Sequence, residues 1–191
     1  MSEEITTNLE NEQEQIGFGP RIGATALDFV INIIVGAIMG AVLGATLVAI
    51  FFPDAADPSG TEGFDDAAAA IEGFAAIFAG IIGSMAGVFL MTIIMFLIEG
   101  ATGQSVGKMI LKIKNANVDG SKASAGTLWT RALLKYVYVI LALIAGITGI
   151  ALIGTLGFLL GLVIFIGCFF VLGEKKQSIH DMIAKTAVYR K

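Results

Sequence analysis

The sequence predicts an all-α membrane protein, built as a four-helix transmembrane bundle with a short cytoplasmic β-hairpin between helices 2 and 3. Composition indicates the class, because 56% of the 191 residues are hydrophobic and only 15% are charged, whereas a soluble domain has about 25% charged residues. Long uncharged runs indicate the helices. The positions of the twelve lysines and arginines predict the orientation, since positive charge beside membrane spans stays in the cytoplasm.

The N-terminal residues 1–16 are expected to form a tail separate from the membrane domain, which takes up residues 17–191. Five glutamates and few large apolar side chains predict a disordered, solvated cytoplasmic segment. A cleavable signal peptide is not expected, because such peptides begin with basic residues.

Four spans follow from the lengths of the apolar runs, since a helix needs about 20 apolar residues to cross a bilayer. The apolar run 132–172, whose one charged residue is Lys135 near its start, is too long for one span and fits two, with a turn within 146–149 or near Gly154. One long tilted helix would put Lys135 and Lys175 on opposite sides, against the charge rule. The spans are therefore expected near residues 23–52, 70–98, 132–150 and 153–172.

Basic side chains avoid the first loop, 53–66, which holds five acidic residues and no base. Arg21 precedes the first span, six bases lie between the second and third spans, and five follow the fourth. This asymmetry predicts that both termini are cytoplasmic, in a bacterial cytoplasmic (inner) membrane.

Glycines repeat every four residues in the first span, at Gly36, Gly40 and Gly44. Such a stripe lets two helix backbones approach closely in lipid. It predicts either packing within the four-helix bundle or a homo-oligomer formed through these glycines, and the sequence leaves both open.

The segment after the second span is expected to form the hairpin. Residues 109–114 alternate apolar and basic side chains, and Asp119-Gly120 is a typical hairpin turn. Its bases, with the preceding lysine, are expected to contact anionic lipid head groups of the inner leaflet: Lys108, Lys112 and Lys114. Thr102 stands where a phosphate-binding loop has its first glycine, and Met109 replaces the Ser/Thr of that loop. No nucleotide, other cofactor, metal or nucleic acid is therefore expected as a ligand.

Two aspartates and one arginine stand out near the spans. Asp28 follows Arg21 by two helical turns, so both project from one helix face. An unpaired carboxylate in a span costs about 2.5–3.5 kcal/mol, so Asp28 is expected to be paired, protonated or functional. Asp181 lies just beyond the last span, where it is suited to cap a short helix that starts near Ser178.

These three residues resemble the signature of the RDD family of bacterial integral membrane proteins, which is named after them. Asp181 lies in the tail pattern Ser-Ile-His-Asp-Met-Ile-Ala-Lys-Thr-Ala-Val, and residues 103–108 with Asp119-Gly120 are similar to the family's central motif. Many members have a single span after that motif, where this chain has two. The resemblance implies membrane transport, with cation/proton exchange suggested for some members.

Two functions therefore compete. In the first, the protein transports small ions: Asp28 binds the cation or proton, Arg21 tunes its pKa and Asp181 gates from inside. In the second, it is a non-transporting accessory or scaffold protein, and Arg21, Asp28 and Asp181 form a structural polar cluster. An enzyme is not expected, because His180, the one histidine, has no nucleophile near it in sequence and too few companions for a metal site.

Overall fold

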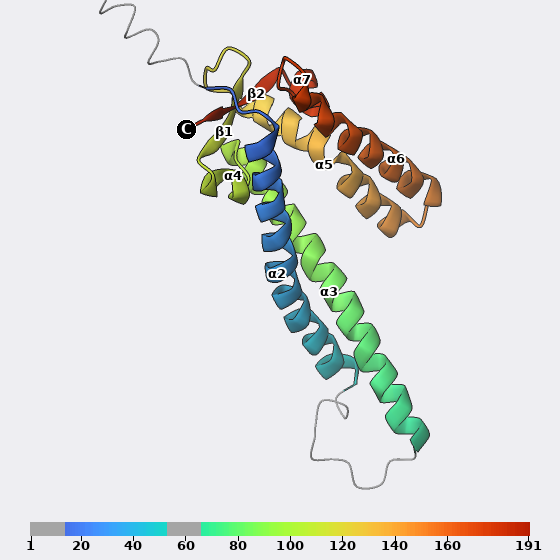
Figure 1. Cartoon of the computed structure of the whole chain (residues 1–191). Helices are drawn as coiled ribbons and strands as arrows, with labels where there is room; N and C mark the ends of the chain where they lie inside the picture. The colour runs from blue at the N-terminus through green and yellow to red at the C-terminus, as the bar shows by residue number, and fades with distance from the viewer. Residues whose placement is uncertain (1–13, 53–65) are drawn as a thin grey trace, which may run out of the picture. The chain divides into compact units, whose positions relative to one another are not determined.

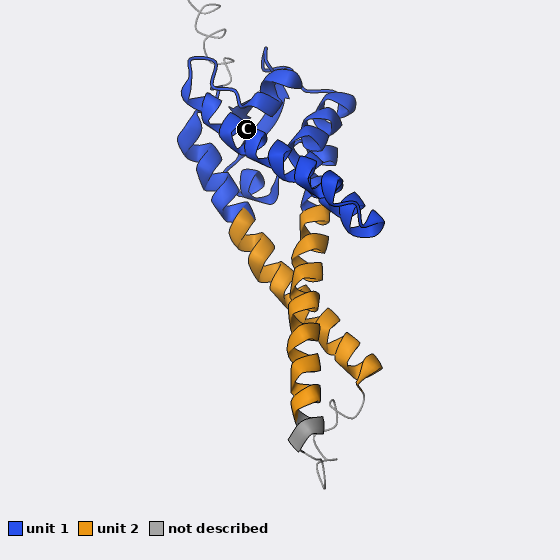
Figure 2. Cartoon of the chain, turned by 90° about the vertical axis from the view of Figure 1, so that its right-hand side faces the viewer, with its two compact units in different colours: residues 1–28, 95–191 blue, residues 29–94 orange. Residues whose placement is uncertain are grey.

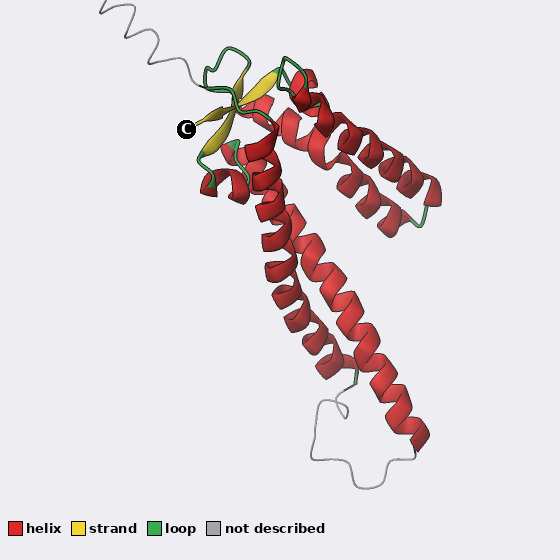
Figure 3. Cartoon of the chain, in the orientation of Figure 1, coloured by secondary structure: helices red, strands yellow, loops and turns green. Residues whose placement is uncertain are grey.

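The computed structural model describes residues 14–52 and 66–191, which are mainly helical (Figures 1 and 3). Its elements in chain order are α2 (Phe18–Phe51), α3 (Asp66–Thr102), α4 (Val106–Ile110), β1 (Ile113–Asn117), α5 (Ala125–Thr148), α6 (Ala151–Cys168), the 3-10 helix η2 (Phe169–Leu172), α7 (Ile179–Ile183) and β2 (Thr186–Arg190). Most of the acidic tail, and residues 53–65 of the acidic loop, lie outside the described residues.

Four helical segments in the described chain are long and apolar enough to cross a membrane: Phe18–Phe51, Gly73–Thr102, Ala125–Thr148 and Ala151–Leu172. The predicted number of membrane-spanning helices is therefore confirmed; three of them start a few residues earlier than expected, and the second starts three residues later. The turn between the last two falls within the predicted window. Gly149 ends α5 in the left-handed region (φ 69°) and donates its N–H to the carbonyl of Ala145, a conformation that glycine adopts without strain.

The chain divides into two compact units (Figure 2). Unit 1 consists of Met1–Asp28 and Met95–Lys191, and unit 2 consists of Phe29–Ile94. Helices α2 and α3 each contribute residues to both.

Unit 2 is held together by the glycine stripe. A Cβ added to Gly36, Gly40 or Gly44 would lie 3.0 Å or less from backbone atoms of the α3 residues Ala79–Val88, and Gly83 and Gly87 of α3 are equally confined by α2. Asn32 also donates to the hydroxyl of Thr92 at 2.8 Å. Internal packing, one of the two predicted uses, accounts for the stripe. A homo-oligomer through the same glycines stays a prediction.

Unit 1 contains a small antiparallel sheet that differs from the predicted hairpin. Strand β1 pairs with the C-terminal strand β2, from Ile113 opposite Arg190 to Asn117 opposite Thr186. The prediction of a local hairpin across Asp119-Gly120 was therefore wrong. This turn lies in the loop that follows β1, and the first residues of the expected strand belong to α4. The cause is long-range pairing, which an alternating pattern does not reveal.

The N-terminal segment joins this sheet on the other edge of β2. The backbone N–H of Ile16 donates to the carbonyl of Val188 at 2.8 Å, and Arg190 donates to the carbonyl of Glu14. Ile16 is buried with Ala24, Ile113 and Val188 in a small apolar core. The end of the predicted disordered tail, residues 14–16, is thus ordered in unit 1.

Candidate functional site: a buried ionic cluster

Asp181 is fully buried and accepts hydrogen bonds on both carboxylate oxygens. Ser178 is the N-cap of α7, and its backbone N–H donates to Oδ2 of Asp181 at 3.2 Å, so the predicted capping role is confirmed. Arg21 Nη1 donates to the same oxygen at 2.6 Å, and Arg131 Nε donates to Oδ1 at 2.7 Å. One carboxylate therefore connects the start of α2, the start of α5 and the C-terminal segment.

A second carboxylate, Glu99 near the end of α3, is bound by three cations. Lys108 Nζ and Arg131 Nη1 lie 2.8 and 2.7 Å from Oε1, and Lys135 Nζ lies 2.6 Å from Oε2. Arg131 and Lys135 are one turn apart on α5, so both reach the same acid. Arg131 joins the two carboxylates into one network, here called the ionic cluster: Arg21, Glu99, Lys108, Arg131, Lys135 and Asp181.

Asp28 lies next to the ionic cluster but outside its salt bridges. Its Oδ1 accepts the backbone N–H of Gly107 at 2.7 Å, and no lysine or arginine in the described chain forms a salt bridge with it. A side chain on Gly107 would collide with the carbonyl oxygen of Ala24. This glycine therefore lets α4 approach α2 closely enough for the bond to Asp28 to form.

The predicted head-group lysines lie in different environments. Lys108 is buried, and its ammonium donates to Glu99 and to Oδ1 of Asn115 at 2.9 Å. Its charge is thus engaged inside the protein rather than free to meet the membrane surface. Lys112 is exposed and Lys114 is partly exposed; their contact with lipid stays a prediction.

Burial and neighbouring charges shift the pKa values of the cluster outside the spans. Burial alone would raise the pKa of Asp181, but Arg131, with His180 and Arg21, holds it well below its usual range. Burial, followed by repulsion from Arg131, lowers the pKa of His180 to about 3. The same two causes lower the pKa of Lys108 to about 7, against the attraction of Glu99. At neutral pH Asp181 is therefore ionised and His180 is neutral.

His180 is held by the cluster rather than free to act. Its Nε2 lies 3.2 Å from Arg131 Nη2 and 3.0 Å from the hydroxyl of Ser178. Because a guanidinium only donates, Nε2 is the acceptor and the proton of the neutral ring is on Nδ1. No group of three or more His, Cys, Asp or Glu side chains that could hold a metal occurs among the described residues.

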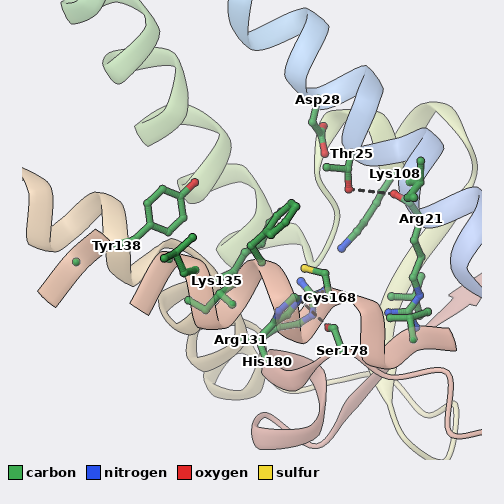
Figure 4. A pocket seen from close by; sticks show the side chains of 18 of the residues that line it. Arg21, Thr25, Asp28, Lys108, Arg131, Lys135, Tyr138, Cys168, Ser178 and His180 are labelled. Atoms are coloured by element: carbon green, nitrogen blue, oxygen red, sulfur yellow. Dashed lines mark hydrogen bonds between the residues drawn. The ribbon is translucent and has the colours of Figure 1, made fainter. Parts of the chain in front are cut away.

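A cavity of about 640 Å³ lies beside the cluster, with side chains from α2, α4, α5, α6 and the C-terminal segment around it (Figure 4). Its polar part is formed by Asp28 and by all four cations of the ionic cluster, with Thr25, Ser178 and His180. Apolar side chains form much of the remaining wall, among them Phe18, Ile22, Phe158, Leu162 and Phe165.

The family model of the RDD family matches residues 16–185, most of the chain. The chain belongs to the RDD family. Searches of curated proteins and of solved structures returned no match. The family, with the four long apolar helices, gives a multi-pass membrane protein.

The three residues that give the RDD family its name are brought into one region of unit 1. Arg21 and Asp181 form a salt bridge, whereas Asp28 binds backbone. Sequence reasoning missed the central roles of Glu99 and Arg131. The signal that could have revealed them is a carboxylate at the end of an apolar span, since such a charge needs a buried partner.

Proposed function

We propose that this RDD family protein is a non-transporting accessory or scaffold membrane protein in which Arg21, Asp28 and Asp181 are structural. The observation that supports it most is the environment of Asp181, whose two oxygens are occupied by two guanidiniums and a backbone N–H. A carboxylate that gates an ion path must release its partners, and this one holds three segments of unit 1 together.

Such a cluster stabilises the folded protein only while each buried charge keeps its partner. Removing one partner of a buried ion pair leaves an uncompensated charge and costs about 3–5 kcal/mol. That loss is a large part of the 5–15 kcal/mol that stabilises a typical protein. Removing Asp181 leaves Arg21 and Arg131 unbalanced, so the structural role predicts loss of folding.

The test is the stability of an Asp181→Asn variant purified in a mild detergent. We expect a strongly lowered thermal midpoint, or loss of monodisperse protein on gel filtration. Glu174→Gln is the matched control, because it also removes one carboxylate but at an exposed position in the same C-terminal segment. An Asp181→Asn protein as stable as the Glu174→Gln protein would contradict the structural role.

Cation/proton exchange through Asp28 is the second candidate function, and one observation favours it. The Asp28 carboxylate lines the cavity and, in the described chain, has a backbone N–H but no cation as its partner. A carboxylate without a paired cation can exchange a proton for a metal cation. Four cations line the same cavity, and their repulsion of an entering cation favours the accessory role.

Exchange can be measured with a pH-sensitive dye in everted vesicles that contain the full chain. The accessory role predicts no cation-driven proton movement above that of vesicles without the protein. Exchange that is lost in Asp28→Asn but kept in Asp119→Asn, a loop aspartate outside the cavity, would instead establish the second candidate.

A further inference from the structure

The lining of the cavity in unit 1 combines two kinds of side chain. One kind is cationic: Arg21, Lys108, Arg131 and Lys135. The other kind is apolar and belongs to helices that are long enough to span a membrane, including Ile22 of α2 and Phe158, Leu162 and Phe165 of α6. Figure 4 shows the polar side chains gathered around the cavity. A ligand that matches both kinds of lining is an anion with an apolar tail.

The charges around the cavity do not balance. The ionic cluster has four cations and two carboxylates, Glu99 and Asp181. Asp28, which also lines the cavity, adds a third negative charge. One positive charge is therefore left over in a largely buried site, where an unbalanced charge is costly.

One of the four cations, Lys135, also has unused donors. Lys135 Nζ carries three N–H groups but makes one hydrogen bond in the described chain, to Glu99. Burial, followed by repulsion from Arg131, lowers the pKa of Lys108 to about 7 although Glu99 lies 2.8 Å away. A bound anion would accept the free N–H groups and restore the charge balance.

The apolar side distinguishes a lipid from a small soluble anion. Phe158, Leu162 and Phe165 are 66%, 42% and 64% exposed, and in a membrane these surfaces of α6 meet hydrocarbon. A volume of about 640 Å³ is within the range of about 300–1,000 Å³ that is usual for ligand pockets. An inorganic anion would need neither this space nor this wall.

We propose that the cavity binds one anionic phospholipid, with its phosphate at the four cations and an acyl chain along the apolar wall. This proposal rests on the non-transporting role above, since it fills the cavity with a ligand that stays. It also places the predicted head-group contact of Lys108 inside the protein, at a buried site.

The test is the thermal midpoint of the purified full chain, delipidated in a neutral detergent, as lipid is added. The probes are dioctanoyl phosphatidylglycerol, dioctanoyl phosphatidylcholine and inorganic phosphate. We expect a saturable rise with phosphatidylglycerol, because a ligand that binds only the folded state stabilises it. Phosphatidylcholine, which has no net charge, and phosphate, which has no acyl chain, are expected to give none.

Two pairs of variants locate the site. Lys135→Gln removes one lining cation while Glu99 keeps Lys108 and Arg131, and it should weaken phosphatidylglycerol binding about tenfold, the loss of one hydrogen bond to a charged group. Lys112→Gln, at an exposed lysine outside the cavity, should bind as the unmodified chain does. Leu162→Trp should block the apolar wall, whereas Leu160→Trp, at a similarly exposed leucine of α6 that does not line the cavity, should not.

Several outcomes would overturn the proposal. Equal stabilisation by phosphatidylcholine would remove the role of charge, and equal stabilisation by phosphate would make the ligand a small anion. Equal losses in Lys112→Gln and Lys135→Gln would indicate adsorption to the surface. Should Lys135→Gln not fold, unchanged binding by Leu162→Trp still overturns it. The accessory role fails separately, through Asp28-dependent exchange or a stable Asp181→Asn protein.

Discussion

At the scale of single residues, Glu99 has more charged partners than any other described side chain. Three cations depend on it, and its side chain is only 1% exposed. Glu99→Gln keeps the shape and removes the charge, which leaves Lys108, Lys135 and half of the Arg131 interaction uncompensated. We expect a loss of about 3–5 kcal/mol, measured as a lower thermal midpoint in detergent. Glu174→Gln, at an exposed position, should change it little; equal midpoints would contradict a central role for Glu99.

His180 gives the ionic cluster a dependence on pH. Its pKa falls from 6.5 to about 3 on burial and beside Arg131, so between these values the unfolded chain holds the proton and the folded chain does not. The unfolded state then binds more protons, and the free energy of unfolding decreases as pH is lowered below 6.5. The slope is about 1.4 kcal/mol per pH unit.

Thermal midpoints between pH 6.5 and about 5 measure this slope. In that window Asp181, whose pKa is held below its ordinary value of 3.8, is ionised in both states and adds almost no slope. The chain has no other histidine, so His180→Gln should flatten the profile. A variant with the same slope as the unmodified chain would assign the effect to other groups.

At the residue level, the sequence singled out those residues that carry a family pattern. That pattern singled out Arg21, Asp28 and Asp181, and Arg21 and Asp181 form a salt bridge. It did not reveal Arg131, because an arginine in a basic segment has the same local sequence whether it faces solvent or a buried carboxylate. Only the fold brings Glu99, 32 residues away, within 2.7 Å of it.

At the scale of elements, helices were predictable and strand partners were not. Apolar run length and Gly149 marked α5 and α6, because these signals are local. The partner of β1 is β2, which lies about 70 residues later in the chain. Local sequence signals do not identify a partner that far away. A turn sequence such as Asp119-Gly120 favours a nearby partner but does not exclude a distant one.

Close helix packing in unit 2 leads to a further prediction. A Cβ on Gly87 would lie under 3.0 Å from backbone atoms of Gly36 and Gly40, whereas one on Gly80 of the same helix would meet nothing within 4 Å. Gly87→Ala must push α2 and α3 apart, and overpacking of this kind costs about 1–3 kcal/mol. Thermal midpoints should fall for Gly87→Ala and stay level for Gly80→Ala. A stable Gly87→Ala protein would show that the two helices do not approach closely in solution.

At the scale of the whole molecule, the twelve bases predict an orientation that labelling can test. None lies in 53–66, and each lies beside the same side of the four expected spans. Transferring a cluster of bases across the membrane is disfavoured, so the termini and the 103–124 segment should face the cytoplasm. Single cysteines introduced as Ser59→Cys and Ser121→Cys, in a Cys168→Ser background, report the two sides.

A membrane-impermeant maleimide added to intact spheroplasts should label Ser59→Cys at once and Ser121→Cys only after permeabilisation. Labelling both variants after permeabilisation controls for reactivity, because each cysteine must then be accessible. The reverse pattern would mean that the basic side faces outward and that charge does not orient this chain. The predicted pattern would put the ionic cluster, which includes Lys108 of the 103–124 segment, near the inner leaflet, where anionic lipids are concentrated.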